Sequence, residues 1–195
     1  GMVITVDAKT GQIYQGAPPP QITDILKEHP IMVTPASANL KTATKVYVNL
    51  GEPELAAQIA KSNVDGVGLL RAEFMIAAIG THPKKLIRDG KKQLFINQLA
   101  ENLETFCAAF NPRPVVYRAT DFKTNEYSHL KGGEQFEPQE SNPMLGYRGA
   151  FRYVADPQVF DLELAAIKKV RNQANYKNLW LMVPFVHAPE ELKQV

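Results

Sequence analysis

The chain has 195 residues, of which 45% are apolar and 22% are charged, a balance typical of a folded globular protein. Lys and Arg number 22 against 20 for Asp and Glu, and this formal net charge of +2 gives no indication of a nucleic-acid partner. Cys107 is the only cysteine, which excludes an intrachain disulfide and a cysteine-based zinc site. No apolar run reaches the roughly 18 residues of a membrane-spanning helix, so we expect a cytoplasmic protein with no membrane partner.

The first 45 residues predict a small hairpin and a linker. Apolar runs over 3–6 and 12–14 are separated by turn residues, a pattern typical of a β-hairpin. Prolines at 18–20 cannot continue a strand, and residues 21–45 carry only a short helical stretch over 22–27. We therefore expect a hairpin within 1–16, a linker over 17–45 and one larger domain over 46–195.

Strand-like and helix-like segments alternate from residue 45 onwards. Apolar runs predict strands at 46–50, 66–70, 114–117 and 179–183. Because these runs are apolar throughout, we expect a parallel α/β sheet with both faces buried, and four βα units correspond to the first half of a TIM-type (β/α)8 barrel. Residues 188–192 are typical of a helix start, so we expect the chain to be part of a longer one.

The helices between these strands have clear apolar faces. Asp156 and Pro157 are expected to cap a helix whose apolar face carries Phe160, Leu164, Ile167 and Val170. Residues 91–110 form the most regular segment, and Cys107 is expected to be a small buried hydrophobe on its apolar face. Spacings of three and four define that face through Phe95, Leu99, Leu103, Phe106 and Phe110.

Two arginines follow neighbouring strands of the predicted sheet. Arg71 ends the second run and Arg118 ends the third, and in parallel α/β folds such positions share one edge of the sheet. Two guanidinium groups there would suit a small anion that carries a carboxylate, a phosphate or both. The structural alternative is that the arginines pair with Glu73 and Asp121 instead.

Other polar residues near the same edge are less specific. A loop rich in Gly and Pro over 141–149 would bring Arg148 towards that edge, or would merely cap the next helix. His187 follows the fourth strand. Asp121, Glu126 and His129 are a conceivable metal cluster, for which a solvated loop is the preferred interpretation.

Three segments resemble the PEP-utilising enzyme family: residues 66–74, 116–127 and 142–149, which read GVGLLRAEF, VYRATDFKTNEY and NPMLGYRG. Within this family the form Arg-x-x-Asp-Phe-Lys-x-Asn-Glu-Tyr is most similar to the phosphoenolpyruvate synthase branch. The resemblance covers residues 46–195, and residues 3–16 look like the last hairpin of the family's phosphohistidine domain.

This resemblance implies transfer of a phosphoryl group from phosphohistidine to pyruvate enolate, so that ATP, pyruvate and water give phosphoenolpyruvate, AMP and phosphate. Residues matching Arg71, Arg118 and Arg148 would bind the substrate. The family's Mg2+ ligands, its Ser-x-Gly-Thr-Asn-Asp signature and its proton-donating cysteine have no counterpart here. We therefore expect no metal ligands and no complete set of catalytic residues in this chain, which would be inactive alone.

Three alternatives remain open at this point. The first is a piece of the pyruvate phosphate dikinase branch of the same family. The second is a non-catalytic module that binds phosphoenolpyruvate or another anion. The third is a self-associating module, since a half barrel leaves two sheet edges and its inner apolar face exposed.

Overall fold

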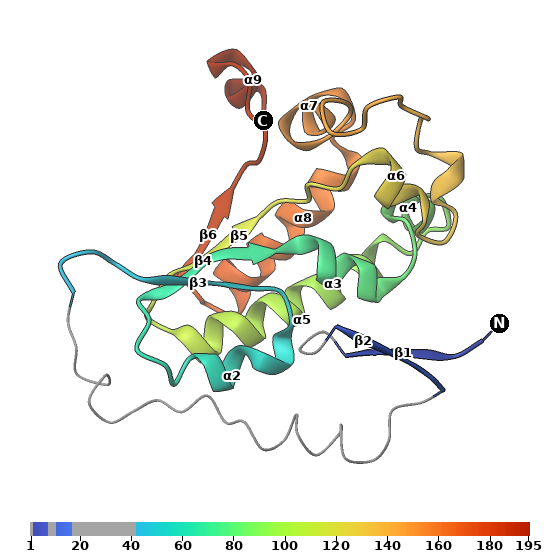
Figure 1. Ribbon diagram of the computed structural model, residues 1–195. Coiled ribbons are helices and arrows are strands. Elements are labelled where there is room, and N and C mark those ends of the chain that lie inside the picture. The colour runs from blue at the N-terminus through green and yellow to red at the C-terminus, as the bar shows by residue number, and fades with distance from the viewer. Residues whose placement is uncertain (1, 8–10, 17–41) are drawn as a thin grey trace. The chain divides into compact units, whose positions relative to one another are not determined.

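The computed structural model describes residues 2–7, 11–16 and 42–195, and the chain divides into two compact units, 1–40 and 41–195 (Figure 1). The helical stretch expected at 22–27 and most of the expected linker lie outside the described residues. In the first unit, β1 (Ile4–Asp7) and β2 (Gln12–Gln15) pair antiparallel. The predicted hairpin is therefore confirmed.

The second unit is built on a four-stranded parallel sheet. Its strands are β3 (Tyr47–Leu50), β4 (Gly66–Arg71), β5 (Val115–Arg118) and β6 (Leu179–Met182). They lie side by side in chain order, β3-β4-β5-β6, and each neighbouring pair is parallel. The predicted parallel α/β sheet is confirmed, and its strands lie within one or two residues of the predicted runs.

Helices fill every connection between these strands. A 3-10 turn (Pro53–Leu55) and α2 (Ala56–Ile59) follow β3, and α3 (Ala72–Ile79), α4 (Pro83–Arg88) and α5 (Lys92–Phe110) follow β4. After β5 come α6 (Thr124–Ser128), a 3-10 turn (Gly133–Gln135), α7 (Gly149–Ala155), α8 (Gln158–Lys168) and a π-helical turn (Lys169–Gln173). α9 (Pro189–Gln194) follows β6. No helix in the described ranges is long and apolar enough to cross a membrane.

The core lies between one face of the sheet and the helices α2, α5 and α8, which group on one side of it (Figure 1). α5 provides the largest share of this core, as its spacing predicts. Cys107 is fully buried on the same face, and burial raises the pKa of its thiol to about 12, so it behaves as a small apolar side chain. The predicted apolar positions of α5 are all fully buried: Phe95, Leu99, Leu103, Phe106 and Phe110.

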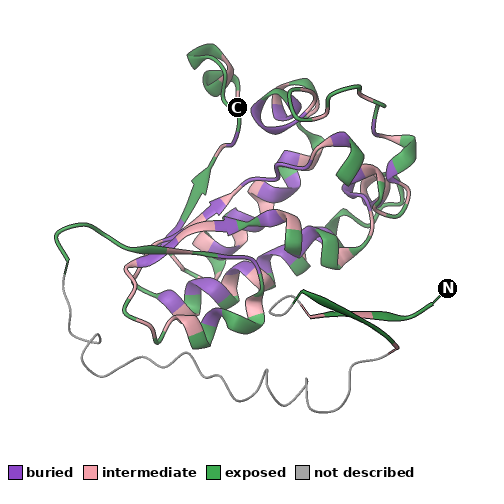
Figure 2. Cartoon of the chain, in the orientation of Figure 1, coloured by how far each residue is buried: buried purple, intermediate pink, exposed green. Residues whose placement is uncertain are grey.

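The opposite face of the sheet is exposed, so the expectation that both faces are buried is wrong for the described residues. Trp180 is 61% exposed and Tyr47 is 44% exposed, and β6 is coloured as largely exposed in Figure 2. These two side chains and Met182 border an open apolar concavity of about 690 Å³. A continuous apolar run specifies a strand but does not say how many of its faces are covered.

The start of α8 also differs from the prediction. Asp156 ends α7 and forms an ion pair with Lys84, and Pro157 precedes α8 without a side-chain cap. Leu164 is only partly buried on α8, whereas Glu163 beside it is completely buried. A carboxylate therefore occupies a core position on the predicted apolar face.

Candidate functional site

The candidate site lies at the carboxyl ends of β4 and β5. Arg71 and Arg118 are partners in the register of these two strands, so the sheet places the two arginines next to each other. The loop before α7 brings Arg148 to the same place, which is one of the two outcomes that the sequence left open. An open concavity of about 340 Å³ lies among Arg71, Glu73, Phe74, Arg118, Asp121, Phe122, Lys123, Glu126 and Arg148.

Arg118 is held by two carboxylates. Its Nη2 lies 3.1 Å from Glu73 Oε1 and its Nη1 lies 3.5 Å from Asp121 Oδ2. Glu73 Oε1 also accepts a hydrogen bond from the Asp121 backbone N–H at 2.8 Å. The structural pairing considered for Arg118 is therefore present, and it fixes the direction of this side chain at the mouth of the concavity.

Arg148 is almost fully buried and pairs with Asp121 through two parallel hydrogen bonds. Its Nε and Nη2 donate to Oδ1 and Oδ2 at 2.9 and 2.8 Å. The guanidinium group also lies over the ring of Phe185, 3.9 Å from the ring centroid. Asp121 is 5% exposed and thus serves both Arg118 and Arg148, rather than lying in a solvated loop.

Arg71 differs from the other two arginines because its side chain is exposed and forms no hydrogen bond or ion pair within the described part of the chain. Lys123 adds a fourth cation to the concavity and pairs with Glu126 at 2.7 Å. Four cations therefore face three carboxylates around this opening. The surplus charge is positive, and Arg71 is the donor best placed to bind a ligand.

The chain between Arg118 and Asp121 is fixed by hydrogen bonds from its backbone. Ala119 N–H donates to the carbonyl oxygen of Met182 at 3.0 Å, which continues the sheet for one residue. Thr120 N–H donates to Glu163 Oε2 at 3.0 Å, and the Thr120 carbonyl oxygen accepts a hydrogen bond from Tyr153 Oη. Groups on a strand and on two helices thus determine where Asp121 lies.

Glu163 is the buried carboxylate beneath this segment, and sequence reasoning missed it. Its Oε2 also accepts a hydrogen bond from Tyr117 Oη at 2.5 Å, and its Oε1 has no hydrogen-bond partner in the described ranges. Burial raises the pKa of Glu163 to about 7, although the two donors oppose the shift. The sequence did contain a signal for this buried position. Glu163 lies three residues after Phe160 and four before Ile167, and this spacing puts it on the apolar face of the helix.

A second buried polar cluster lies beside the site, and the sequence did not indicate it either. Arg152 donates to both oxygens of Glu137, at 2.7 and 2.8 Å, and His82 Nε2 lies 3.0 Å from Glu137 Oε1. His82 Nδ1 accepts the N–H of Lys84, so Nε2 is the nitrogen that donates to Glu137. Burial disfavours ionisation of Glu137, but these two donors outweigh it and lower the pKa of its carboxyl group.

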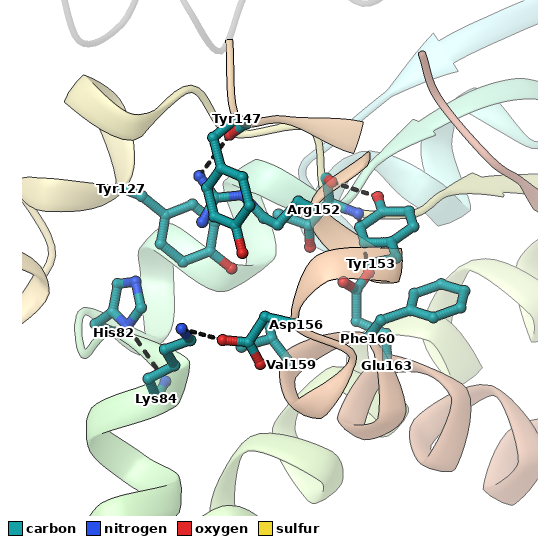
Figure 3. A pocket seen from close by; sticks show the side chains of 11 residues that line it. His82, Lys84, Tyr127, Tyr147, Arg152, Tyr153, Asp156, Val159, Phe160 and Glu163 are labelled. Atoms are coloured by element: carbon teal, nitrogen blue, oxygen red, sulfur yellow. Dashed lines mark hydrogen bonds and ion pairs between the residues drawn. The ribbon is translucent and has the colours of Figure 1, made fainter. Parts of the chain in front are cut away.

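Aromatic rings enclose this cluster. The Arg152 guanidinium carbon lies 4.4 and 5.0 Å from the ring centroids of Tyr147 and Tyr127, and Figure 3 shows both rings close to it. A small cavity of about 10 Å³, with room for one water molecule, is lined by His82, Arg152 and the two tyrosines together with Glu163. The cluster is thus a closed structural network that supports the loop before α7, rather than a ligand site.

The remaining candidates are His187 and the metal cluster considered from the sequence. His187 is exposed, and its backbone N–H and its ring contact Glu191 of α9, so it helps to start that helix. The described residues contain no group of three His, Cys, Asp or Glu side chains that could hold a metal ion. Asp121, which the conceivable metal cluster required, is instead bound by arginines.

Comparison with known proteins defines the class. Residues 27–195 match the profile of the PEP-utilising enzyme, PEP-binding domain, and the chain therefore belongs to the PEP-utilising enzyme family. This confirms the resemblance that three sequence segments carried.

Individual relatives narrow the class further. The chain is 44% identical over 196 residues to the phosphoenolpyruvate synthase of Pyrococcus furiosus and 42% identical over 208 residues to the probable phosphoenolpyruvate synthase of Staphylothermus marinus. Each alignment covers 100% of this chain and 24% of the relative. The probable phosphoenolpyruvate synthase of Methanocaldococcus jannaschii is 42% identical, with 16% of its length covered. The chain thus spans about a quarter or less of these relatives.

Proposed function

We propose that this chain forms the anion-binding part of a phosphoenolpyruvate synthase, and that Arg71, Arg118 and Arg148 form the subsite for phosphoenolpyruvate or pyruvate. The observation that carries this proposal is the paired register of Arg71 and Arg118 at the carboxyl edge of the sheet. The relatives whose alignments cover the whole of this chain are named phosphoenolpyruvate synthase or probable phosphoenolpyruvate synthase, and this favours the synthase branch over the dikinase branch.

The chemistry fits the geometry of the three arginines. A phosphoryl group that moves to an enolate oxygen carries negative charge throughout, and fixed cations in a shielded site stabilise it. Arg71 is free to bind the ligand directly. Arg118 is directed by Glu73 and Asp121, and the buried Arg148 keeps Asp121 in place through two hydrogen bonds. This arrangement would hold and orient an anion without having to reorganise.

The sheet topology supports a proposal for the whole domain. Four parallel strands in chain order, with helices on one face, are the arrangement expected of half of a (β/α)8 barrel. On this proposal the exposed face around Trp180 is the inner face of that barrel. Residues 1–16 would then be the last hairpin of a phosphohistidine domain, followed by a linker over 17–45 and the barrel over 46–195.

The family resemblance implies a magnesium ion, but the donors described here do not fit one. All three carboxylates at the site are engaged: Glu73 and Asp121 accept hydrogen bonds from arginines and backbone, and Glu126 pairs with Lys123. Among their buried oxygens in the described residues, only Glu73 Oε2 has no hydrogen-bond partner, and a single oxygen is too few for such an ion. A divalent cation prefers free carboxylate and carbonyl oxygens, and the neighbouring cations would repel it. We propose that the metal ligands and the acid of the complete enzyme lie outside this chain, which therefore has no turnover alone.

Removing Arg71 is the direct test of the anion subsite. We expect Arg71→Ala to weaken phosphoenolpyruvate binding at least about tenfold, because a charge-assisted hydrogen bond contributes roughly 1.5–3 kcal/mol. Stability should change little, since this side chain is exposed and unpaired in the described part of the chain. The measurement is a calorimetric titration with phosphoenolpyruvate, with and without magnesium, beside an assay for AMP release from ATP and pyruvate.

Lys61→Ala is the matched control, because Lys61 is exposed and lies between α2 and β4, at the opposite edge of the sheet. It removes the same charge and should leave binding unchanged. Equal weakening in both variants would show a nonspecific charge effect and would contradict the subsite. AMP release by the isolated chain would contradict its expected lack of turnover.

The exposed sheet face supports a second proposal, that two copies of the isolated chain associate through it. The exposed apolar surface is formed by Tyr47 on the edge strand β3 and by Trp180 and Met182 on the edge strand β6. We expect a solution mass near twice that of the chain at high concentration, and a lower mass for Trp180→Glu. Sedimentation equilibrium measures both, and a wild-type chain that remains monomeric at all concentrations would refute the association.

A further inference from the structure

Glu163 occupies an unusual position directly beneath the candidate site. It is 0% exposed and extends from α8 to the end of β5, 43 residues earlier in the chain, where it accepts the Thr120 N–H. Its second donor is Tyr117 Oη, from β5 itself. A buried carboxyl group without a cationic partner is costly, and among the described residues Glu163 contacts none of the three arginines of the subsite.

Among the described residues, no cation contacts the Glu163 carboxyl group directly. The titratable and charged residues that line the same small cavity come from α4, α6 and α7, and Glu73 adds a negative charge from α3. Two of the cations are paired elsewhere, Arg152 with Glu137 and Lys84 with Asp156. These cavity residues are His82 just before α4, Lys84 of α4, Tyr127 of α6, Tyr147 in the loop before α7, Arg152 and Tyr153 of α7, and Asp156 just after it.

Thr120 directly precedes Asp121, whose side chain contacts both Arg118 and Arg148. A hydrogen bond at Thr120 N–H therefore fixes the backbone one residue before the carboxylate that organises two arginines. Loss of this bond would let the segment move and would leave the N–H buried without a partner.

We propose that Glu163 is a positioning residue of the anion subsite: by accepting the Thr120 N–H it keeps Asp121 where it can hold Arg118 and Arg148. This inference rests on the proposed function, because it assumes that the three arginines bind the anion. Glu163 itself is not among the residues that line the concavity.

Three variants separate this role from a general contribution to packing. Glu163→Gln keeps an oxygen acceptor of the same shape, so phosphoenolpyruvate binding should stay within about threefold of wild type. Glu163→Leu removes the acceptor and should weaken binding at least about tenfold. Tyr117→Phe removes the other donor to the same oxygen, leaves the Thr120 bond intact, and should also stay within about threefold.

Amide hydrogen exchange provides a readout that needs no ligand. In the wild-type chain the Thr120 N–H should be protected, and in Glu163→Leu it should exchange at least about tenfold faster, because its acceptor is gone. The N–H of Val67, which donates to the Pro114 carbonyl oxygen at 2.8 Å, should exchange alike in both. If Glu163→Leu does not fold, the wild-type measurement decides: a Thr120 N–H that exchanges as fast as an exposed one overturns the proposal.

The pH dependence of unfolding tests whether Glu163 is the buried acid. With a pKa near 7 in the folded chain against 4.5 ordinarily, the folded state keeps a proton that the unfolded state has released. Stability from this group is therefore fully present below about pH 4.5 and is lost as the pH rises through about 7. Wild type should lose stability relative to Glu163→Gln between about pH 5 and 8.

The outcomes of the titration separate the two proposals. A wild-type chain that binds no phosphoenolpyruvate overturns the anion subsite itself, and the positioning role falls with it. A wild-type chain that binds, beside a folded Glu163→Leu that binds equally well, overturns the positioning role alone. Weakening by Glu163→Leu together with retention in Glu163→Gln and Tyr117→Phe supports both.

Discussion

Replacement of Arg152 by methionine is expected to lower the free energy of unfolding by about 3–5 kcal/mol, because it removes one partner of a buried ion pair. Arg152 and Glu137 are 8% and 9% exposed, and two hydrogen bonds of 2.7 and 2.8 Å join them. Without Arg152, the Glu137 carboxylate keeps only His82 as a side-chain donor in the described part of the chain. The measurement is denaturant unfolding followed by circular dichroism.

This effect is large because Glu137 would remain as a buried charge without its main partner. If Glu137 is changed as well, in Glu137→Gln/Arg152→Met, neither member of the pair leaves an unpaired buried charge, and we expect about half or more of the lost stability to return. The deficit of the single variant should also shrink at acid pH, since the unpaired Glu137 can then be protonated.

An exposed ion pair serves as the control. Lys85 and Asp89 lie 2.7 Å apart on the surface near the end of α4, with side chains 23% and 35% exposed. Asp89→Asn should cost no more than about 1 kcal/mol, because water screens such a pair. If Arg152→Met cost as little as this surface variant, the Glu137–Arg152 pair would not be a buried element of the fold.

The parts of this fold that could be predicted are those in which one segment carries its own signal. α5 shows this most clearly, because the 3.6-residue period alone places Phe95, Leu99 and Leu103 in the core. The strands were predictable as apolar runs, and because parallel strands end at a common edge, the positions of Arg71 and Arg118 were predictable too. The Gly- and Pro-rich loop and then the resemblance both indicated Arg148, whose role in binding stays a prediction.

The parts that could not be predicted depend on contacts between distant segments. His82 meets Glu137 across 55 positions, and Glu163 meets Tyr117 across 46, so no local spacing indicates either pair. A glutamate within an apolar stripe shows that a buried partner must exist, but not which residue it is. The exposed sheet face was missed for the same reason, since a strand's sequence does not say what packs on it.

Gly149 is a position where a single added methyl group is expected to have a large effect on both stability and ligand binding. Its φ is +57°, and a Cβ atom there would lie 2.6 Å from the Pro184 carbonyl oxygen and 2.7 Å from Phe185 Cβ. We expect Gly149→Ala to lower the free energy of unfolding by about 2–5 kcal/mol, from the left-handed backbone together with the forced displacement. Denaturant unfolding measures this loss.

Moving Pro184 and Phe185 away from an alanine at position 149 should also disturb the candidate site. Ala150 N–H donates to the same Pro184 carbonyl oxygen at 2.9 Å, and Arg148 lies over the Phe185 ring. Moving the two segments apart would break the first contact and loosen the second, so Arg148 would hold Asp121 less firmly. We therefore expect Gly149→Ala to weaken phosphoenolpyruvate binding as well, in the calorimetric titration used for Arg71.

Gly90→Ala separates backbone strain from crowding, because Gly90 has a φ of +70° but no atom within 4 Å of an added Cβ. This variant should cost only about 1–2 kcal/mol, the ordinary penalty of a left-handed alanine, and should leave ligand binding unchanged. The excess loss in Gly149→Ala then measures how closely the loop before α7 packs against the end of β6. Equal losses in the two alanine variants would mean that this contact is loose, and that Arg148 owes its position to its hydrogen bonds with Asp121 and Met144 rather than to Phe185.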